Sequence, residues 1–324
     1  MVTPMRILLL SLLALGTVAC GGDFSNEDLE FLNALPERED LATALPGAPH
    51  NAARLDGSVQ ALALGELSRL YEDTRRASDD FNRGVDGLLT LLESIRSQPP
   101  TTRAPGTRTW GPYPDRQHAG LEVRFQMTRD AARFQYALQY RPRGAGEDAW
   151  WSLIEGHFDA VAGGIRKGEG SVQLRVGDAR AHGFPTGDLG VLQLLTLHYQ
   201  TRTQPVRVQE IFEFSEGLGP TELRYTYRAF TDGPGEISFE MANIQATPGA
   251  ALETLDITSR WTADQGGIGT VVVRSGDYAG ARKIECWDAA FRTTYERANW
   301  DPLGGSGELR SCPDLSAFGP VPGT

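Results

Sequence analysis

The sequence predicts an α+β fold in which an N-terminal helical segment packs on a large curled antiparallel β-sheet. Two observations lead to this fold class. Apolar residues recur at three- and four-residue steps between residues 58 and 97, which is the period of an amphipathic helix. From residue 121 to residue 287 the period falls to two, and turn sequences such as TDGPGE and DQGG interrupt it, which is typical of short antiparallel strands.

Residues 20–57 predict a tether and a linker that contain one short helix. Ser25 and Asp28 have the spacing of a capping box at a helix start, and Pro36 predicts the end of that helix. The stretch from 36 to 57 is rich in Pro, Ala and Asp and shows no clear period. We therefore interpret it as a linker.

Residues 58–97 predict an amphipathic helical segment. Gly84 and Gly87 weaken its middle, so one kinked helix and two separate helices are both open. Pro99 and Pro100 end it, and residues 98–118 predict an irregular crossing rich in Pro and Gly. The apolar stripe of this segment needs a partner, and we expect the apolar face of the sheet to supply it.

An antiparallel β domain is predicted over residues 105–300, with about ten or eleven strands. The stretch LEVRFQMT places Val123 and Phe125 on one face and Arg124 on the other, and FQYALQY repeats the pattern. Further strands are expected near 149–158, 171–177, 190–201, 206–214, 221–231, 235–244, 252–262, 268–275 and 281–287. Strand twist curls such a sheet. It either closes into a barrel or wraps the helical segment as a half-barrel, and we expect the second arrangement.

The composition limits the class of partner. The formal charge of the 324-residue chain is −11, and Arg6 is the only charged side chain in residues 1–19, so the rest carries −12. A chain this acidic is not expected to bind nucleic acid or anionic lipid headgroups through its net charge. We also expect no cofactor and no metal site, since the CxxC and HxxH spacings of metal sites are absent from the sequence.

The first 20 residues have the three parts of a secretory leader: Arg6, an apolar run from Ile7 to Leu15, and small residues up to Cys20. The apolar run is about half of the roughly 20 residues needed to span a bilayer. The TVAC sequence at 17–20 resembles the lipobox of bacterial lipoproteins, although Thr17 stands where that family usually has Leu. An ordinary cleaved signal peptide with an unrelated cysteine is the alternative.

This resemblance implies that residues 1–19 are a signal peptide and that Cys20 carries acyl chains of the palmitate type. The protein would then be a lipid-anchored component of the cell envelope. Gly21, rather than Asp, follows the cysteine. By the sorting habit of enteric bacteria, this residue favours the outer membrane.

Cys286 and Cys312 are the two remaining cysteines, and an even pair in an exported chain predicts a disulfide bond. Two free thiols are the alternative. The bond would fasten a C-terminal loop and tail, residues 301–324. The Cys-Trp-Asp…Cys-Pro pattern from Cys286 to Pro313 resembles the ending of uncharacterised exported lipoproteins of high-GC bacteria, and this resemblance implies no activity.

Trp150, Trp151 and Trp287 are the candidate ligand-facing aromatic residues, with structural packing as the alternative. No catalytic residue is assigned, because the GxSxG and HExxH motifs are absent and the five histidines show no pairing at i+3 or i+4. We expect a non-enzymatic, structural or interaction role at the cell envelope, with an envelope protein or a lipid as partner. A half-barrel that binds a hydrophobic ligand is the alternative, and an envelope hydrolase is a third.

Overall fold

The computed structural model describes residues 24–47, 64–162, 164, 166–215, 222–315 and 318–320. It divides into unit 1, made of Met1–Ala42 and Phe81–Gly217, and unit 2, made of Thr43–Asp80 and Leu218–Thr324. The expected signal peptide and Cys20 lie outside the described residues.

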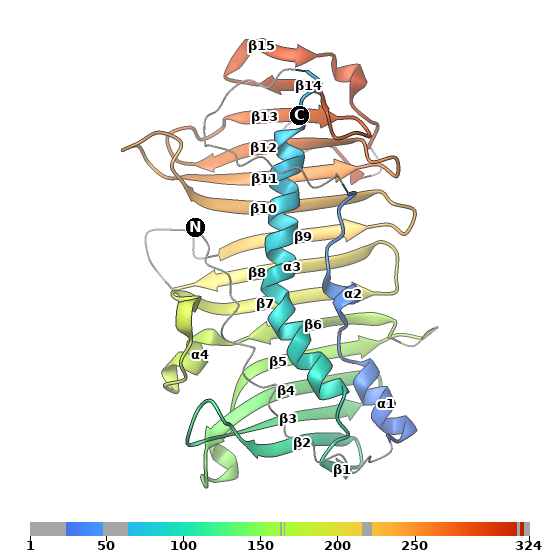
Figure 1. Ribbon diagram of the computed structural model, residues 1–324, viewed down its shortest axis with the longest axis vertical. Coiled ribbons are helices and arrows are strands. Elements are labelled where there is room, and N and C mark those ends of the chain that lie inside the picture. Colours follow the sequence, from blue (N-terminus) through green and yellow to red (C-terminus); the bar gives the residue numbers. More distant parts are fainter. Residues whose placement is uncertain are drawn as a thin grey trace. The chain divides into compact units, whose positions relative to one another are not determined.

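Unit 1 contains eight antiparallel strands that follow one another in chain order (Figure 1). They are β1 (Thr102–Ala104), β2 (Thr107–Pro114), β3 (Leu121–Asp130), β4 (Arg133–Pro142), β5 (Trp151–Ala160), β6 (Gly168–Leu174), β7 (Leu192–Thr201) and β8 (Val206–Phe214). Its helices are α1 (Asn26–Asn33), α2 (Arg38–Leu41), α4 (Val176–Ala181), the 3-10 helices η2 (Glu147–Ala149) and η3 (Gly187–Leu189), and Phe81–Arg96 of α3.

Unit 2 contains seven antiparallel strands, also in chain order. They are β9 (Glu222–Ala229), β10 (Gly235–Ile244), β11 (Glu253–Trp261), β12 (Gly267–Ser275), β13 (Arg282–Trp287), β14 (Thr293–Ala298) and β15 (Asp301–Gly307). The N-terminal part of α3 (Arg69–Arg96), up to Asp80, belongs to this unit, as does the 3-10 helix η4 (Leu309–Ser311).

The α+β class is confirmed, but the strand number is wrong: the described residues form fifteen strands rather than ten or eleven. Two of the missed strands, β1 and β2, lie in the supposed crossing at 98–118. Strand β2 contains Gly111, with φ of 97°, and Pro112, at a register shift between Trp110 and Tyr113. A bulge is where a strand accepts these residues, so a sequence that resembles a loop forms a strand.

The other missed strands are β14 and β15. Strand β14 lies within the predicted β domain but beyond its last expected strand, and β15 lies in the expected C-terminal loop and tail. Strand β15 is rich in glycine because it lies close to β14. A Cβ atom on Gly305 would be 2.8 Å from the carbonyl oxygen of Glu296. The expected loop and tail at 301–324 therefore begins with a strand.

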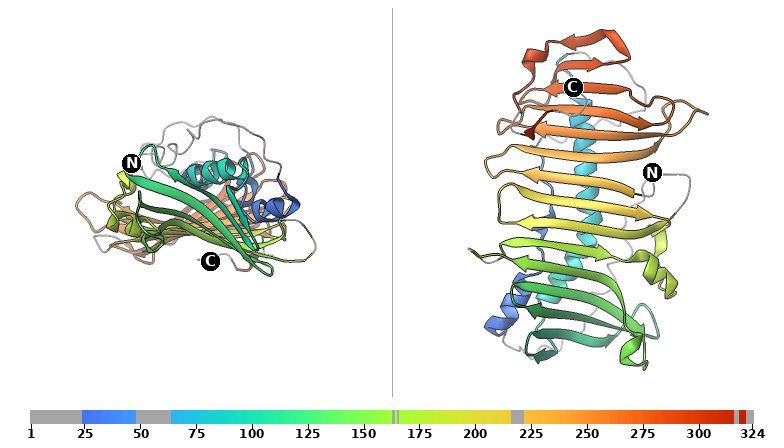
Figure 2. Two further views of the ribbon diagram at one scale, coloured as in Figure 1. Left: turned by 90° about the horizontal axis from the view of Figure 1, so that it is seen from below. Right: turned by 180° about the vertical axis from the view of Figure 1, so that it is seen from behind.

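Helices α1, α2 and the unit 1 part of α3 lie over one face of strands β1–β8, as Figures 1 and 2 show. In unit 2 the first turns of α3 lie over one face of β9–β15. We call these the inner faces and the opposite ones the outer faces. Neither series of strands closes, because the first and last strands of each series do not pair with one another. The expected packing of helix on sheet is present within each unit.

The period-two pattern predicted correctly which faces of β3 and β4 are buried. In β3 the side chains of Val123, Phe125 and Met127 are buried, and the residues between them are half-buried. In β4 the same alternation buries Phe134 and Tyr136.

Helix α3 begins later than expected, at Arg69, and runs without a break through Gly84 and Gly87. Its first turn is capped from two sides. The Ser68 hydroxyl accepts a hydrogen bond from the backbone amide of Tyr71 at 3.2 Å. The buried Glu285 carboxylate on β13 accepts one from the amide of Arg69 at 2.9 Å. A side chain more than 200 residues away therefore helps to set the helix start.

Candidate functional site

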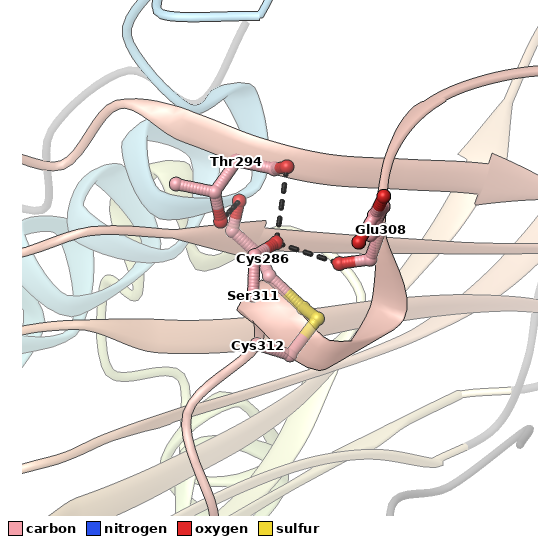
Figure 3. The surroundings of a disulfide bond; sticks show 5 residues. All are labelled: Cys286, Thr294, Glu308, Ser311 and Cys312. Atoms are coloured by element: carbon pink, nitrogen blue, oxygen red, sulfur yellow. Dashed lines mark hydrogen bonds between the residues drawn. A yellow bond between two sulfur atoms is a disulfide. The ribbon is translucent and has the colours of Figure 1, made fainter.

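Cys286 and Cys312 form the predicted disulfide bond, with a Cα–Cα distance of 5.3 Å (Figure 3). Cys286 is buried on β13, and Cys312 follows η4. The Ser311 hydroxyl donates hydrogen bonds to the carbonyl oxygens of Thr294, at 3.1 Å, and Glu308, at 2.7 Å. The bond thus fixes a short 3-10 turn against β13 and β14.

Beyond the disulfide, residues 313–315 and 318–320 continue over the outer face of unit 2. Leu315 and Phe318 pack with Ile268, Cys286 and Tyr295 in one apolar cluster. The buried Arg260 guanidinium on β11 donates hydrogen bonds to the backbone carbonyls of Phe318, Gly319 and Pro320. We call residues 308–320 the C-terminal strap, because its described part is held by a covalent bond, an apolar cluster and a buried arginine.

The three candidate tryptophans are packed rather than open. Two guanidinium carbons lie over the half-buried Trp150 ring, that of Arg124 at 4.2 Å and that of Arg141 at 4.4 Å from its centroid. Trp151 is buried and stacks on His182, with centroids 4.9 Å apart and planes 5° apart.

Trp287 is fully buried and contacts Tyr71 of α3. Its indole N–H donates to the carbonyl of Gln265 at 3.2 Å. The ring lies over Gly267, where a Cβ atom would be 2.2 Å from it. These contacts give each of the three tryptophans a structural role.

A Ser-His-Asp group lies on the outer face of unit 1. The Ser171 hydroxyl on β6 is 3.1 Å from Nδ1 of His157 on β5, and Nε2 of His157 is 3.6 Å from Oδ2 of Asp159. His157 and Asp159 share a face because they are two residues apart on one strand. His198 on β7 pairs with Ser171 from the other side.

This group has the residue types of a nucleophilic triad but not its setting. Ser171 is only 7% exposed. It lies inside β6, which is paired with β5 on one side and β7 on the other, so the neighbouring backbone amides serve the sheet rather than an oxyanion hole. Burial, followed by the charge of Arg133, lowers the pKa of His157. The arrangement therefore suits polar recognition better than acyl transfer.

The sequence offered one signal for this group, the spacing His157-x-Asp159 on a strand. It gave no signal for Ser171 or His198, because the partners of a residue across strands depend on register. The registers align five polar residues on neighbouring strands of the outer face: Gln135, His157, Ser171, His198 and Gln209.

A second histidine lies in an aromatic cluster. Nδ1 of His118 is 2.7 Å from Oδ2 of Asp115, and its ring is 4.2 Å from that of Phe184. Burial alone would raise the pKa of Asp115, but hydrogen bonds from His118 and from the amides of Gln117 and His118 hold it below its usual value. The Asp115 carboxylate thus closes a tight turn.

Helix α3 packs closely on the described part of each inner face. In unit 1, a cavity of about 10 Å³ lies between Val85 and Leu88 of α3 and apolar strand residues, among them Ile154 and Leu197. That volume holds no more than about one water molecule, whereas small-molecule sites measure about 300–1,000 Å³. In unit 2, Leu70 of α3 packs directly on Gly269.

One carboxyl group lies on the inner face of unit 1. Glu210 of β8 is 3% exposed and pairs with Leu197 of β7. Burial raises its pKa to about 8, so the group is largely protonated at neutral pH. Glu210 is an internal polar group of the sheet.

No group of three or more His, Cys, Asp or Glu side chains within the described ranges is placed to hold a metal ion. Within the same ranges, none of the helices combines the length and hydropathy needed to span a bilayer. Comparison with protein-family models, with curated proteins and with solved structures finds no match to this chain.

Proposed function

We propose that this protein is an extracytoplasmic lipoprotein, anchored to the outer membrane through acyl chains on Cys20, with a non-catalytic interaction role at the cell envelope. Its partner would be an envelope protein that binds the polar outer face of unit 1. The observation that carries the interaction role is the packing of α3 against both inner faces. Because α3 covers the inner faces, the polar side chains that could bind a partner are those of the outer faces.

Two features support the tether and the compartment. The leader has the order of a lipoprotein signal, with TVAC immediately before Gly21. The bond between Cys286 and Cys312 suits an oxidising compartment. Two or three acyl chains make release from a bilayer negligible, whereas a single chain binds only marginally.

The outer face of unit 1 supports a protein partner. Several of its charges are paired: Arg141 on β4 contacts Glu122 on β3 at 3.0 Å and Glu147 in η2 at 2.9 Å, and Arg175, just after β6, contacts Glu155 on β5 at 3.1 Å. Paired charges and amides on a sheet give directional hydrogen bonds without a strong net field. Such a surface fits a protein better than a nucleic acid.

Metabolic labelling with a radioactive fatty acid tests the anchor. We expect label in the wild-type protein and none in Cys20→Ala, and we expect an inhibitor of lipoprotein signal peptidase to leave the longer precursor. A wild-type protein without label, recovered in the soluble fraction, would overturn the proposal.

Native mass spectrometry tests the interaction role against the lipid-binding alternative. The body starting at Phe24 would be exported to the periplasm on a cleavable leader and purified without detergent. We expect the bare polypeptide mass, reduced by two hydrogens for the disulfide. A co-purified lipid in stoichiometric amount would favour the hydrophobic-ligand alternative.

A further inference from the structure

Two exposed apolar side chains stand at the start of α1. Phe24 is 37% exposed and Leu29 is 46% exposed. Ser25 is the N-cap of α1, so these residues occupy the N′ and N4 positions, which bring two apolar side chains together beside a helix start. We call Phe24 and Leu29 the α1 apolar pair.

The α1 apolar pair is fixed to the strands of unit 1. The Asp28 side chain is fully buried and pairs with Arg108, at 2.5 Å, and with Arg103, at 3.0 Å. Phe31 packs edge-on against Phe134 of β4 with centroids 5.4 Å apart. The capping box of Ser25 and Asp28 holds the first turn. The pair therefore cannot swing away from the sheet without breaking buried contacts.

The length of chain before α1 limits how far this pair can lie from the lipid. Phe24 lies four positions after Cys20, and a fully extended chain spans at most about 3.6 Å per residue, or about 14 Å here. The headgroup layer on one side of a bilayer is about 5–8 Å thick. Acyl chains on Cys20 would thus hold Phe24 within or just above the headgroups.

The charges of α1 do not oppose this contact. Glu27 pairs with Arg108 at 2.6 Å, and Glu30 pairs with Arg129. Asp28 is paired as described above. Each acidic side chain of the helix thus has an arginine partner, so α1 presents little net negative charge although the whole chain carries −11.

We propose that the α1 apolar pair, Phe24 and Leu29, inserts into the lipid headgroup region beside the Cys20 anchor, so that α1 lies on the membrane surface and orients unit 1. This inference rests on the proposed lipid anchor. It adds a second, non-covalent contact with the bilayer, which the lipobox alone does not imply.

Site-specific photo-crosslinking tests it with the full acylated protein. Benzoylphenylalanine would replace Phe24 or Leu29, and the protein would be reconstituted in vesicles of phosphatidylethanolamine and phosphatidylglycerol. Val191 is a matched control because it is 59% exposed and lies in the same unit, just before β7. Helix α1 and the start of β7 lie toward opposite ends of the strands in Figure 1.

We expect phospholipid adducts, identified by their mass, at positions 24 and 29 and none at 191. Absence of adducts at 24 and 29, or equal yields at all three positions, would overturn the inference. The intact mass of the same samples reports acylation of Cys20 separately. An unacylated Cys20 would contradict the proposed function, whereas acylated protein without adducts would contradict only the orientation of α1.

Discussion

Leu70 of α3 lies directly against Gly269 of β12, where an added Cβ atom would be 2.9 Å from the Cβ atom of Leu70. One helical turn later, the Thr74 hydroxyl lies 2.6 Å from that of Ser259, the residue that pairs with Gly269 on β11. Small residues on two neighbouring strands therefore let the helix approach the sheet of unit 2 closely.

Gly269→Ala is expected to destabilise the protein, because Leu70 meets the new methyl group with its rigid Cβ atom. Overpacking of this kind costs about 1–3 kcal/mol. Urea unfolding followed by circular dichroism measures the change. Gly47→Ala is the control, since nothing lies within 4 Å of the added atom there. Equal stability of the two variants would contradict close packing at Gly269.

The same contact illustrates what the sequence can predict about the fold. The alternation around Phe125 and the stripe of α3 predict which faces are apolar, because burial and period are local properties. The sequence GGIGTV around Gly269 resembles a turn that leads into a strand. Only the position of Leu70 explains why glycine is needed at residue 269. Strands β2 and β15 were missed for a related reason. Gly111 lies at a bulge and Gly305 lies against the backbone of the neighbouring strand, and local strand propensity predicts neither position.

Cys286→Ser is expected to lower the free energy of unfolding by about 3–4 kcal/mol, because the bond closes a loop of 26 residues in the unfolded chain. Urea unfolding checks this value. Cys312→Ser should have a similar effect, and the double variant should be no less stable than either single one. An unchanged unfolding curve would show that the disulfide does not stabilise the protein.

The C-terminal strap should become sensitive to protease in the same variants. Arg310 is exposed within η4. After release of Cys312, the strap beyond it is held by non-covalent contacts, among them those of Arg228, Arg260 and the Phe318 cluster. Limited trypsin digestion should therefore cleave after Arg310 faster in Cys286→Ser than in the wild type. Equal cleavage rates would show that the strap does not need the bond.

Glu210 is expected to make stability depend on pH. Burial raises the pKa of its folded state to about 8 from an ordinary value of 4.5. Between these values the folded state binds the proton more tightly than the unfolded state does. Stability should therefore fall as the pH rises through this window.

Glu210→Gln removes the titrating group while keeping the shape of the side chain. Urea unfolding would be measured at several pH values between about 5 and 9, which covers the interval between the two pKa values. The variant should gain stability relative to the wild type as the pH rises. Leu197→Ala is a comparison variant on the facing strand. It removes packing without changing charge and should lower stability by a similar amount at every pH. A constant difference between Glu210→Gln and wild type would contradict the raised pKa.

The histidine group on the outer face marks the limit of what the sequence predicts about the site. His157 and Asp159 are two residues apart, so alternation places them on one face. Ser171 and His198 join them through the registers of β5–β6 and β6–β7. Register depends on the whole sheet, and a one-residue slip would move either side chain to the inner face.

A fluorophosphonate probe, which labels activated serine nucleophiles, should not label Ser171. The hydroxyl is nearly buried and has a histidine neighbour at 3.1 Å, but its strand offers no free amides for an oxyanion. A known serine hydrolase serves as the positive control. Labelling that is lost in both Ser171→Ala and His157→Gln would contradict the non-catalytic proposal.

Asp28→Asn is expected to destabilise unit 1 and to remove the part of its stability that is lost at acid pH. Burial alone would raise the pKa of Asp28, but the Ser25 amide, Arg108 and Arg103 together lower it to about 2 from 3.8. Its contribution to stability is therefore present above pH 3.8 and is lost as the pH falls toward 2. The variant removes the closest partner of the buried Arg108, which keeps Glu27 at 2.6 Å. The loss of stability should therefore be smaller than the cost of about 3–5 kcal/mol for a buried pair that is fully broken.

Glu30→Gln is the matched control on the same helix, because Glu30 and its partner Arg129 are 55% and 37% exposed, whereas the Asp28 and Arg108 side chains are buried. An exposed pair contributes about 0–1 kcal/mol, so this variant should unfold close to the wild type at every pH. Urea unfolding at neutral pH and acid titration followed by tryptophan fluorescence measure both effects. If Asp28→Asn matched Glu30→Gln in both measurements, the buried ion pairs would not be what holds α1 on the sheet, and the fixed position of Phe24 and Leu29 would lose its support.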